Sequence, residues 1–145
     1  PIYSNGYNVN YPIAGAKTYF SGGSGLTSNI EDYAKFLQML LNQGTFGDKQ
    51  ILRPETVQLM TSNQIGELNV GKNKFGLGLE IATAQGLANG SKVGKLNWGG
   101  IFNTMFWIDP ERKSIAILMT QVYPAVHSKE LYTQFEQLVN DALDR

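Results

Sequence analysis

The stretch LNWGGIFNTMFWIDP, residues 96–110, decides the fold because it contains two apolar strands with only a short connection between them. Its apolar and aromatic residues predict strands over 93–98 and 103–109. Trp98-Gly99-Gly100 ends the first strand. Two adjacent glycines are typical of a turn, but a strand without side chains also lets another backbone come close. Two interpretations follow: a hairpin turn with Trp98 packed in the core, or a strand that lines a site.

Further strands on either side of this stretch predict a sheet. Residues 114–121 form one of them, and its segment 115–119 is apolar on both faces, which is expected in the middle of a covered sheet. Upstream, apolar residues alternate with glycine or glutamate over 75–81, which is strand spacing with one buried face. Asn89-Gly90 is a turn signal.

Three segments have helical spacing. Ser28 and Glu31 fit a capping box, in which the Ser28 hydroxyl accepts a hydrogen bond from a first-turn amide and Glu31 reaches back. A shorter helix is expected from Pro54, because proline suits the first helical position, and a third from Ser128. The apolar stripe of the first helix comprises Ile30, Tyr33, Ala34, Leu37, Leu40 and Leu41, and that of the last comprises Leu131, Phe135, Leu138 and Ala142.

Together these elements predict an α+β fold, an antiparallel sheet with flanking helices. We expect an irregular lead-in over residues 1–25, a helical segment over 26–62, and strands followed by a C-terminal helix over 73–145.

The composition excludes several classes of site and partner. The chain has no cysteine and one histidine, His127, and its carboxylates lack calcium-loop spacing, so neither a metal nor another cofactor is expected. Twelve acidic and twelve basic residues cancel without a basic stripe, so neither nucleic acid nor an anionic membrane surface is an expected partner. No apolar run approaches the length of a membrane-spanning helix.

A serine nucleophile within the chain is one candidate for chemistry. Ser24, Asp109 and His127 follow one another in the order of an α/β-hydrolase triad. The nucleophile elbow, however, needs a glycine at the position of Leu26, and the chain lacks the alternating strands and helices of a parallel sheet. A Gly-rich connection ahead of a capped helix is therefore the favoured interpretation of this segment.

Four motifs in the first half of the chain occur in a specific order: Gly22–Leu26, Glu31–Phe36, Leu40–Gly44 and Leu52–Met60. FGLGLEI (75–81) and WGGIFNTMFWIDPERKSIAILMTQ (98–121) follow them. In this order and spacing, residues 15–140 resemble the serine β-lactamase and penicillin-binding-protein-like family, which includes class C β-lactamases and family VIII esterases. The resemblance covers the C-terminal portion of that fold, so residues 1–145 are expected to form a single partial domain.

The resemblance implies a role for the two glycines. In this family the strand that lines the active site carries Lys-Thr-Gly or a variant such as Trp-x-Gly, and Trp98-Gly99-Gly100 stands in that place. It implies that Trp98, Gly99 and Gly100 bind substrate and that Ile101 offers its backbone N–H to the oxyanion. Trp98 has no charge to meet a β-lactam carboxylate and Gly99 has no hydroxyl, which favours neutral esters or small amides as substrates.

The nucleophile of that family is missing from these residues. No serine is followed three residues later by lysine, and Tyr3-Ser4-Asn5 stands too close to the glycine-rich segment to be the family's Tyr-x-Asn. We therefore expect the chain alone to be inactive, with the missing N-terminal part of the same fold and a small acyl substrate as its partners. Because that part packs on the same sheet in the family, self-association of the chain is also expected.

Two functions remain open. The first is the C-terminal portion of a serine hydrolase that acts on esters, small amides or β-lactams through an acyl-serine. The second is a non-catalytic binding or scaffold domain of the same fold. Family members are often exported, which favours a periplasmic or secreted location.

Overall fold

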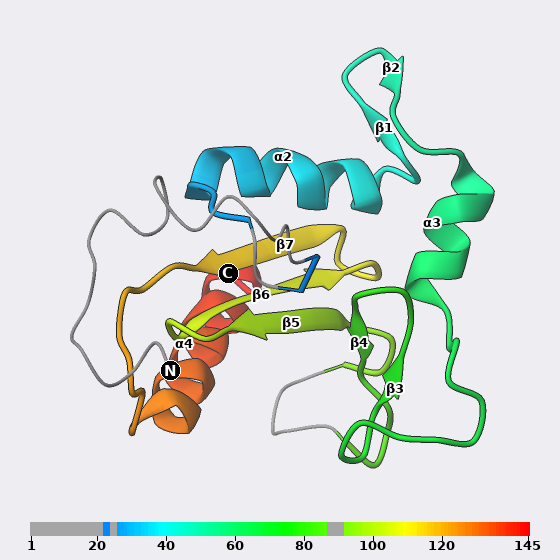
Figure 1. The fold of residues 1–145 in the computed structure, drawn as a ribbon. Helices are drawn as coiled ribbons and strands as arrows, with labels where there is room; N and C mark the ends of the chain where they lie inside the picture. Colours follow the sequence, from blue (N-terminus) through cyan, green and yellow to red (C-terminus); the bar gives the residue numbers. More distant parts are fainter. Residues whose placement is uncertain (1–21, 24–25, 87–91) are drawn as a thin grey trace, which may run out of the picture.

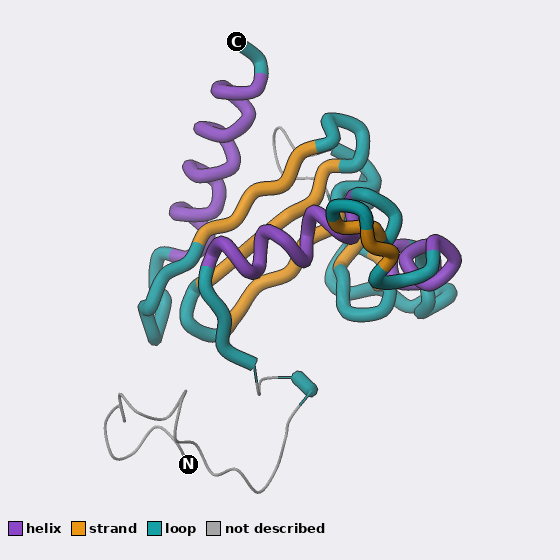
Figure 2. Tube along the Cα trace, turned by 90° about the horizontal axis from the view of Figure 1, so that it is seen from above, coloured by secondary structure: helices purple, strands orange, loops and turns teal. Residues whose placement is uncertain are grey.

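The computed structural model describes residues 22–23, 26–86 and 92–145. A five-stranded antiparallel sheet, in the order β3-β4-β5-β6-β7, lies between helices (Figure 1), which confirms the predicted fold class. Seen from above, α2 crosses one face of the sheet and α4 lies on the other (Figure 2). The helices are α2 (Ile30–Leu41), α3 (Pro54–Thr61) and α4 (Ser128–Leu143), and the strands of this sheet are β3 (Lys74–Phe75), β4 (Glu80–Ile81), β5 (Leu96–Gly100), β6 (Thr104–Asp109) and β7 (Ser114–Leu118).

Helix α2 covers the hydrophobic core. Leu37 and Leu40 are almost completely buried and pack with Leu96 and Ile108 of the sheet, as the predicted stripe requires. Full burial of a leucine stabilises the fold by about 2 kcal/mol. The helix ends at Asn42, and a hairpin that the sequence did not predict follows it. This hairpin pairs β1 (Thr45–Phe46) with β2 (Lys49–Gln50).

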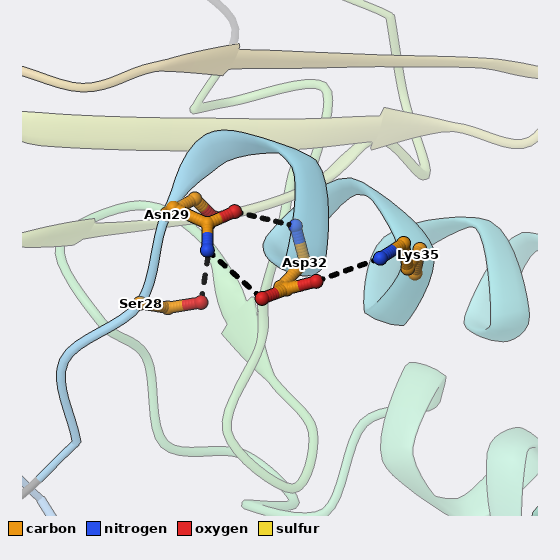
Figure 3. A network of polar contacts seen from close by, with 4 residues as sticks. All are labelled: Ser28, Asn29, Asp32 and Lys35. Atoms are coloured by element: carbon orange, nitrogen blue, oxygen red, sulfur yellow. Dashed lines mark hydrogen bonds and ion pairs between the residues drawn. The ribbon is translucent and has the colours of Figure 1, made fainter.

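The predicted cap of α2 is wrong by one residue. The N-cap is Asn29 rather than Ser28, and the Asn29 side-chain oxygen accepts a hydrogen bond of 2.9 Å from the Asp32 N–H. Asp32 takes the place expected for Glu31, because it accepts from the Asn29 amide group at 2.8 Å and from Lys35 at 2.7 Å (Figure 3). Asparagine caps a helix as well as serine does, so the chain enters the helix one residue later.

Residues 75–81 form a hairpin rather than one strand. Strand β3 pairs with β4 through Lys74↔Ile81 and Phe75↔Glu80, and Gly78 turns the chain with φ +88°. The alternation of apolar residues predicted a single strand because the turn preserves the same spacing. A Cβ on Gly76 would lie 2.0 Å from the Met60 carbonyl oxygen, so the glycine lets this hairpin lie against the end of α3.

Strand β7 lies at one edge of the described sheet, which contradicts its predicted central position. It pairs with β6 alone among the described strands. Its apolar residues Ile115 and Ile117 pack against the core under α2, which accounts for their apolar character.

Helix α4 contacts the sheet through only part of the predicted stripe. The Phe135 ring meets the Trp107 ring edge to face at 5.3 Å, and Glu136 pairs with Lys95. Leu138, predicted on the buried face, is 67% exposed. Val139 is partly buried instead, so the inner face of α4 passes through Val139 rather than through Leu138.

Candidate active-site strand

Strand β5 runs through both glycines before the chain turns. It spans Leu96–Gly100, and the connection to β6 is a three-residue loop over 101–103. Asn103 closes this loop in the left-handed conformation with φ +65°, as the last residue of such hairpin loops commonly does. The glycines are therefore strand residues, and the turn that their sequence suggested occurs one residue later.

Trp98 lies at the surface, not in the core. Its side chain is 43% exposed, and its ring meets the Phe75 ring edge to face at a centroid distance of 4.9 Å. Leu96, two residues earlier on the same face of the strand, packs with Leu37 and Leu40. The buried core thus gives way to a half-exposed aromatic surface within two residues along β5.

The outer edge of β5 is open beside Gly99. Strand β4 pairs with β5 only through Ile81↔Leu96 and Glu80↔Asn97. The Ala82 N–H donates to the Lys95 carbonyl oxygen at 2.9 Å, so odd-numbered residues of β5 direct their backbone groups toward this edge. Within the described part of the chain, no strand pairs with Gly99 on that side. Its backbone can therefore accept a further extended segment.

Both glycines lie close to Thr104 across the hairpin. Gly100 pairs with Thr104, and a Cβ at Gly100 would lie 2.3 Å from the Thr104 Oγ1 atom. At Gly99 the same Cβ would lie 3.2 Å from the Thr104 carbonyl oxygen, a tight contact with backbone. A side chain at Gly100 would therefore force the Thr104 side chain to move.

Ile101 is the first residue of the loop, and its side chain is 56% exposed. Its N–H donates to no acceptor among the described residues. The Asn103 N–H, in contrast, donates to the Gly100 carbonyl oxygen at 3.1 Å. The open backbone of Gly99 and the N–H of Ile101 thus stand two residues apart at the end of one strand.

Two tyrosines lie near β6, one toward each face of the sheet. The Tyr33 ring contacts the Phe106 ring at 5.2 Å, and the Tyr132 hydroxyl donates to the Thr104 carbonyl oxygen at 3.4 Å. Burial raises the pKa of both phenols. Both hydroxyls therefore stay neutral near pH 7, and neither is activated as a general base.

The structure separates the members of the alternative triad. Asp109 is buried, and its Oδ1 accepts from the N–H groups of Glu111 and Arg112 at 3.0 Å each, so the carboxylate stabilises a turn. Arg112 pairs with Asp144 beyond the C-terminal end of α4, whereas His127 is the N-cap of the same helix. A helix of 16 residues is about 24 Å long. Asp109 and His127 thus lie at opposite ends of α4, and Ser24 lies outside the described residues.

On the face of the sheet that α4 covers, polar side chains take part in packing. Lys95 pairs with Glu136 of α4 and lies 5.0 Å from the centre of the Trp107 ring. Across residues 22–23, 26–86 and 92–145, no cluster of three His, Asp or Glu side chains could hold a metal ion. Helices long and apolar enough to cross a membrane are also absent from these residues.

Phe75 and Thr120 contact the end of β5 and the loop that follows it, and the sequence did not predict either contact. Phe75 supports the Trp98 ring, and the Thr120 hydroxyl donates to the carbonyl oxygens of Phe102 and Asn103 in the loop. Neither contact has a local signal in the sequence, because each joins segments that only the folded sheet brings together.

An antiparallel sheet between helices, with a Trp-Gly-Gly strand open at its edge, is the arrangement expected of the β-lactamase and penicillin-binding-protein-like fold. A sequence model of the family described as Beta-lactamase matches residues 3–139. The chain therefore belongs to the beta-lactamase family.

Comparisons with individual proteins agree with this assignment. Protein Rv1367c of Mycobacterium tuberculosis is 29% identical over 122 residues, which cover 74% of this chain and 30% of that protein. EstCE1, a hydrolase with promiscuous acyltransferase activity, has a similar structure with a TM-score of 0.70 at 25% identity, covering 92% of this chain and 34% of its own. Simvastatin synthase (LovD) of Aspergillus terreus gives 0.67 at 26% identity, covering 82% and 36%. The chain thus spans about a third of the length of each of these proteins.

Proposed function

We propose that this chain is the C-terminal portion of a serine hydrolase of the beta-lactamase family, and that it supplies one wall of the active site. Trp98, Gly99 and Gly100 contact the substrate, and the Ile101 N–H donates to the oxyanion that forms when the substrate carbonyl is attacked. A single donor of this kind lowers the barrier by about 3 kcal/mol. The nucleophilic serine and its lysine base come from the missing N-terminal part of the same fold.

The open edge of β5 is the observation that carries this proposal. Gly99 exposes its backbone groups there without a neighbouring strand among the described residues, and the Ile101 N–H has no acceptor of its own. Unpaired strand groups next to two glycines suit a substrate that lies along the strand as an added partner. Backbone N–H and C=O groups with a purely structural role are normally hydrogen-bonded to protein or to water.

The substrate class follows from the chemistry of the wall. The half-exposed Trp98 ring, supported by Phe75, presents an apolar surface beside the glycines. Neither tryptophan nor glycine offers a charge or hydroxyl to a carboxylate. Neutral esters and small amides are therefore favoured over carboxylate-bearing β-lactams, in keeping with the description of EstCE1 as a hydrolase with promiscuous acyltransferase activity.

The function is tested with the longer protein that would contain this chain. Its hydrolysis of p-nitrophenyl butyrate is compared with that of a chromogenic β-lactam, for the wild type and for Trp98→Ala. We expect kcat/KM to be higher for the ester, and Trp98→Ala to lower the ester value about tenfold through loss of aromatic contact. Leu68→Ala, at a 72% exposed position away from β5, is the matched control and should behave as the wild type. A longer protein that folds and turns over neither substrate contradicts the proposal.

A non-catalytic scaffold is the alternative, and the absence of Ser-x-x-Lys within these 145 residues favours it over an independent enzyme. The same hydrolysis assay distinguishes the two functions. A scaffold would bind a partner through the β5 edge without any turnover by the longer protein.

A further inference from the structure

A threonine hydroxyl fixes the loop that carries Ile101. Thr120 stands two residues beyond the end of β7, and its hydroxyl shares its single hydrogen between the Phe102 carbonyl oxygen at 2.7 Å and the Asn103 carbonyl oxygen at 2.9 Å. The Val122 N–H donates to the same Phe102 oxygen at 3.1 Å. The segment after β7 therefore crosses the end of the sheet and holds the β5–β6 loop by its backbone.

These bonds restrain the peptide group that joins Phe102 to Asn103. Its carbonyl oxygen, that of Phe102, has two lone pairs and accepts from both Thr120 and Val122. Its N–H, that of Asn103, donates to the Gly100 carbonyl oxygen, which belongs to the same peptide group as the Ile101 N–H. The restraint on the loop thus reaches the peptide group that carries the Ile101 N–H, although this N–H has no described acceptor.

We infer that Thr120 is a positioning residue for the Ile101 N–H, an inference that rests on the proposed function. An oxyanion donor is most effective when its direction is set before the charge develops, and when it need not break a bond of its own. Here the restraint passes from the Thr120 hydroxyl, 18 residues away from Phe102 in sequence, through the Phe102–Asn103 peptide to the Gly100 carbonyl oxygen, whose peptide group carries the Ile101 N–H.

The loop that this hydroxyl holds has a defined shape. Asn103 is 95% buried and has a left-handed backbone with φ +65°, which asparagine adopts more readily than most residues. The Phe102 ring also meets the Tyr123 ring edge to face at 6.3 Å. Because this second contact remains when the hydroxyl is removed, loss of Thr120 Oγ1 should loosen the loop without displacing it.

The first test measures the anchor in this chain itself. Amide hydrogen exchange is followed by NMR for Thr120→Val and Thr120→Ser. In the Val variant the Asn103 and Val122 amides should exchange several times faster, whereas the serine, which keeps the hydroxyl, should restore wild-type rates. Thr133→Val is the matched control, because the Thr133 hydroxyl also donates to a backbone carbonyl oxygen, that of Lys129 at 2.9 Å, but within α4. Equal exchange rates in Thr120→Val and wild type would overturn the inference.

The second test uses ester hydrolysis by the longer protein. Thr120→Val should lower kcat about tenfold and leave KM within about twofold, because the donor acts on the transition state more than on bound substrate. Thr120→Ser should recover most of kcat, and Thr133→Val should match the wild type. Thr120→Ala, which removes the hydroxyl without adding a methyl group, serves if the valine variant does not fold.

The outcomes distinguish the two proposals. An inactive wild type contradicts the proposed function, and the positioning role falls with it. An active wild type with an unchanged kcat in Thr120→Val contradicts the positioning role alone. A fall in both kcat and melting temperature that serine does not reverse would also contradict it, since a purely structural residue behaves in that way.

Discussion

The Trp98 ring meets the Phe75 ring edge to face at 4.9 Å, which joins strand β5 to the short β3–β4 hairpin. This contact holds the tryptophan half-exposed beside Gly99, at the point where β4 no longer pairs with β5. Under the proposed function, the side chain that faces the substrate is therefore an apolar ring held by an aromatic contact.

Removal of that support should alter substrate binding without abolishing the fold. In the longer protein, Phe75→Ala is expected to raise KM for p-nitrophenyl butyrate about fivefold, because an aromatic pair contributes about 1 kcal/mol beyond burial. Phe75→Tyr keeps the ring and is the matched control. Steady-state kinetics measure both, and a KM equal to that of the wild type in Phe75→Ala would show that Trp98 needs no support.

Substitution of Gly100 should destabilise the hairpin. A Cβ there would lie 2.3 Å from the Thr104 Oγ1, so Gly100→Ala is expected to lower the free energy of unfolding by about 1 to 3 kcal/mol. The additional substitution Thr104→Ala removes the clashing atom and should recover much of the loss. Urea denaturation measures these values. Gly22→Ala, where nothing lies within 4 Å of the added atom, is the control.

Truncation of a buried side chain in the core under α2 should lower the free energy of unfolding far more than truncation of an exposed one. Leu37 is completely buried, so Leu37→Ala is expected to cost about 3 kcal/mol in the free energy of unfolding. Leu59, on α3, is 53% exposed, and Leu59→Ala should cost less than about 1 kcal/mol. Comparable losses in the two variants, measured by urea denaturation, would contradict the assignment of the core.

The start of α2 should show a pH-dependent carboxylate. Hydrogen bonds from Lys35 and then Asn29, with the charge of Lys35, lower the pKa of Asp32. A lowered pKa in the folded state means that the ionised carboxylate stabilises the fold above its unfolded pKa, and that this contribution is lost as the pH falls through the folded pKa. NMR titration should find the Asp32 pKa below its usual range, and Lys35→Met should raise it. Lys49→Met is the control substitution.

We propose that the edge of β7 that no described strand covers lets the isolated chain self-associate. Met119, which directly follows this strand, is apolar and 36% exposed. Open apolar edges pair with other strands, and lysine on an edge opposes this. Light scattering at rising concentration should show mass above that of one chain, and Met119→Lys should reduce it. A chain that stays monomeric throughout would disprove this proposal.

Much of the fold could be predicted from the sequence because its signals are local. The stripe around Leu37 and Leu40 identified α2, and the run of apolar and aromatic residues around Trp107 identified β6. The β3–β4 hairpin could not be predicted in this way, because Gly78 turns the chain without interrupting the alternation. The edge position of β7 was also mispredicted, since a strand that is apolar on both faces does not reveal how many strands pair with it.

The site was predicted in part and for a different reason. Trp98, Gly99, Gly100 and Ile101 were identified through the family resemblance, and their roles remain proposals. Phe75 and Thr120 were missed because their contacts depend on how distant segments meet in the folded sheet. The triad of Ser24, Asp109 and His127 was not favoured from the sequence, and two of its members, Asp109 and His127, lie at opposite ends of α4.

The most direct test of the central claim is intact mass after reaction with a fluorophosphonate, a reagent that labels activated serines. We predict an unchanged mass for the 145-residue chain and a single adduct for the longer protein, because the proposed function places the nucleophile outside these residues. An adduct on the 145-residue chain would contradict the proposed function and would return the nucleophile to a serine of this sequence.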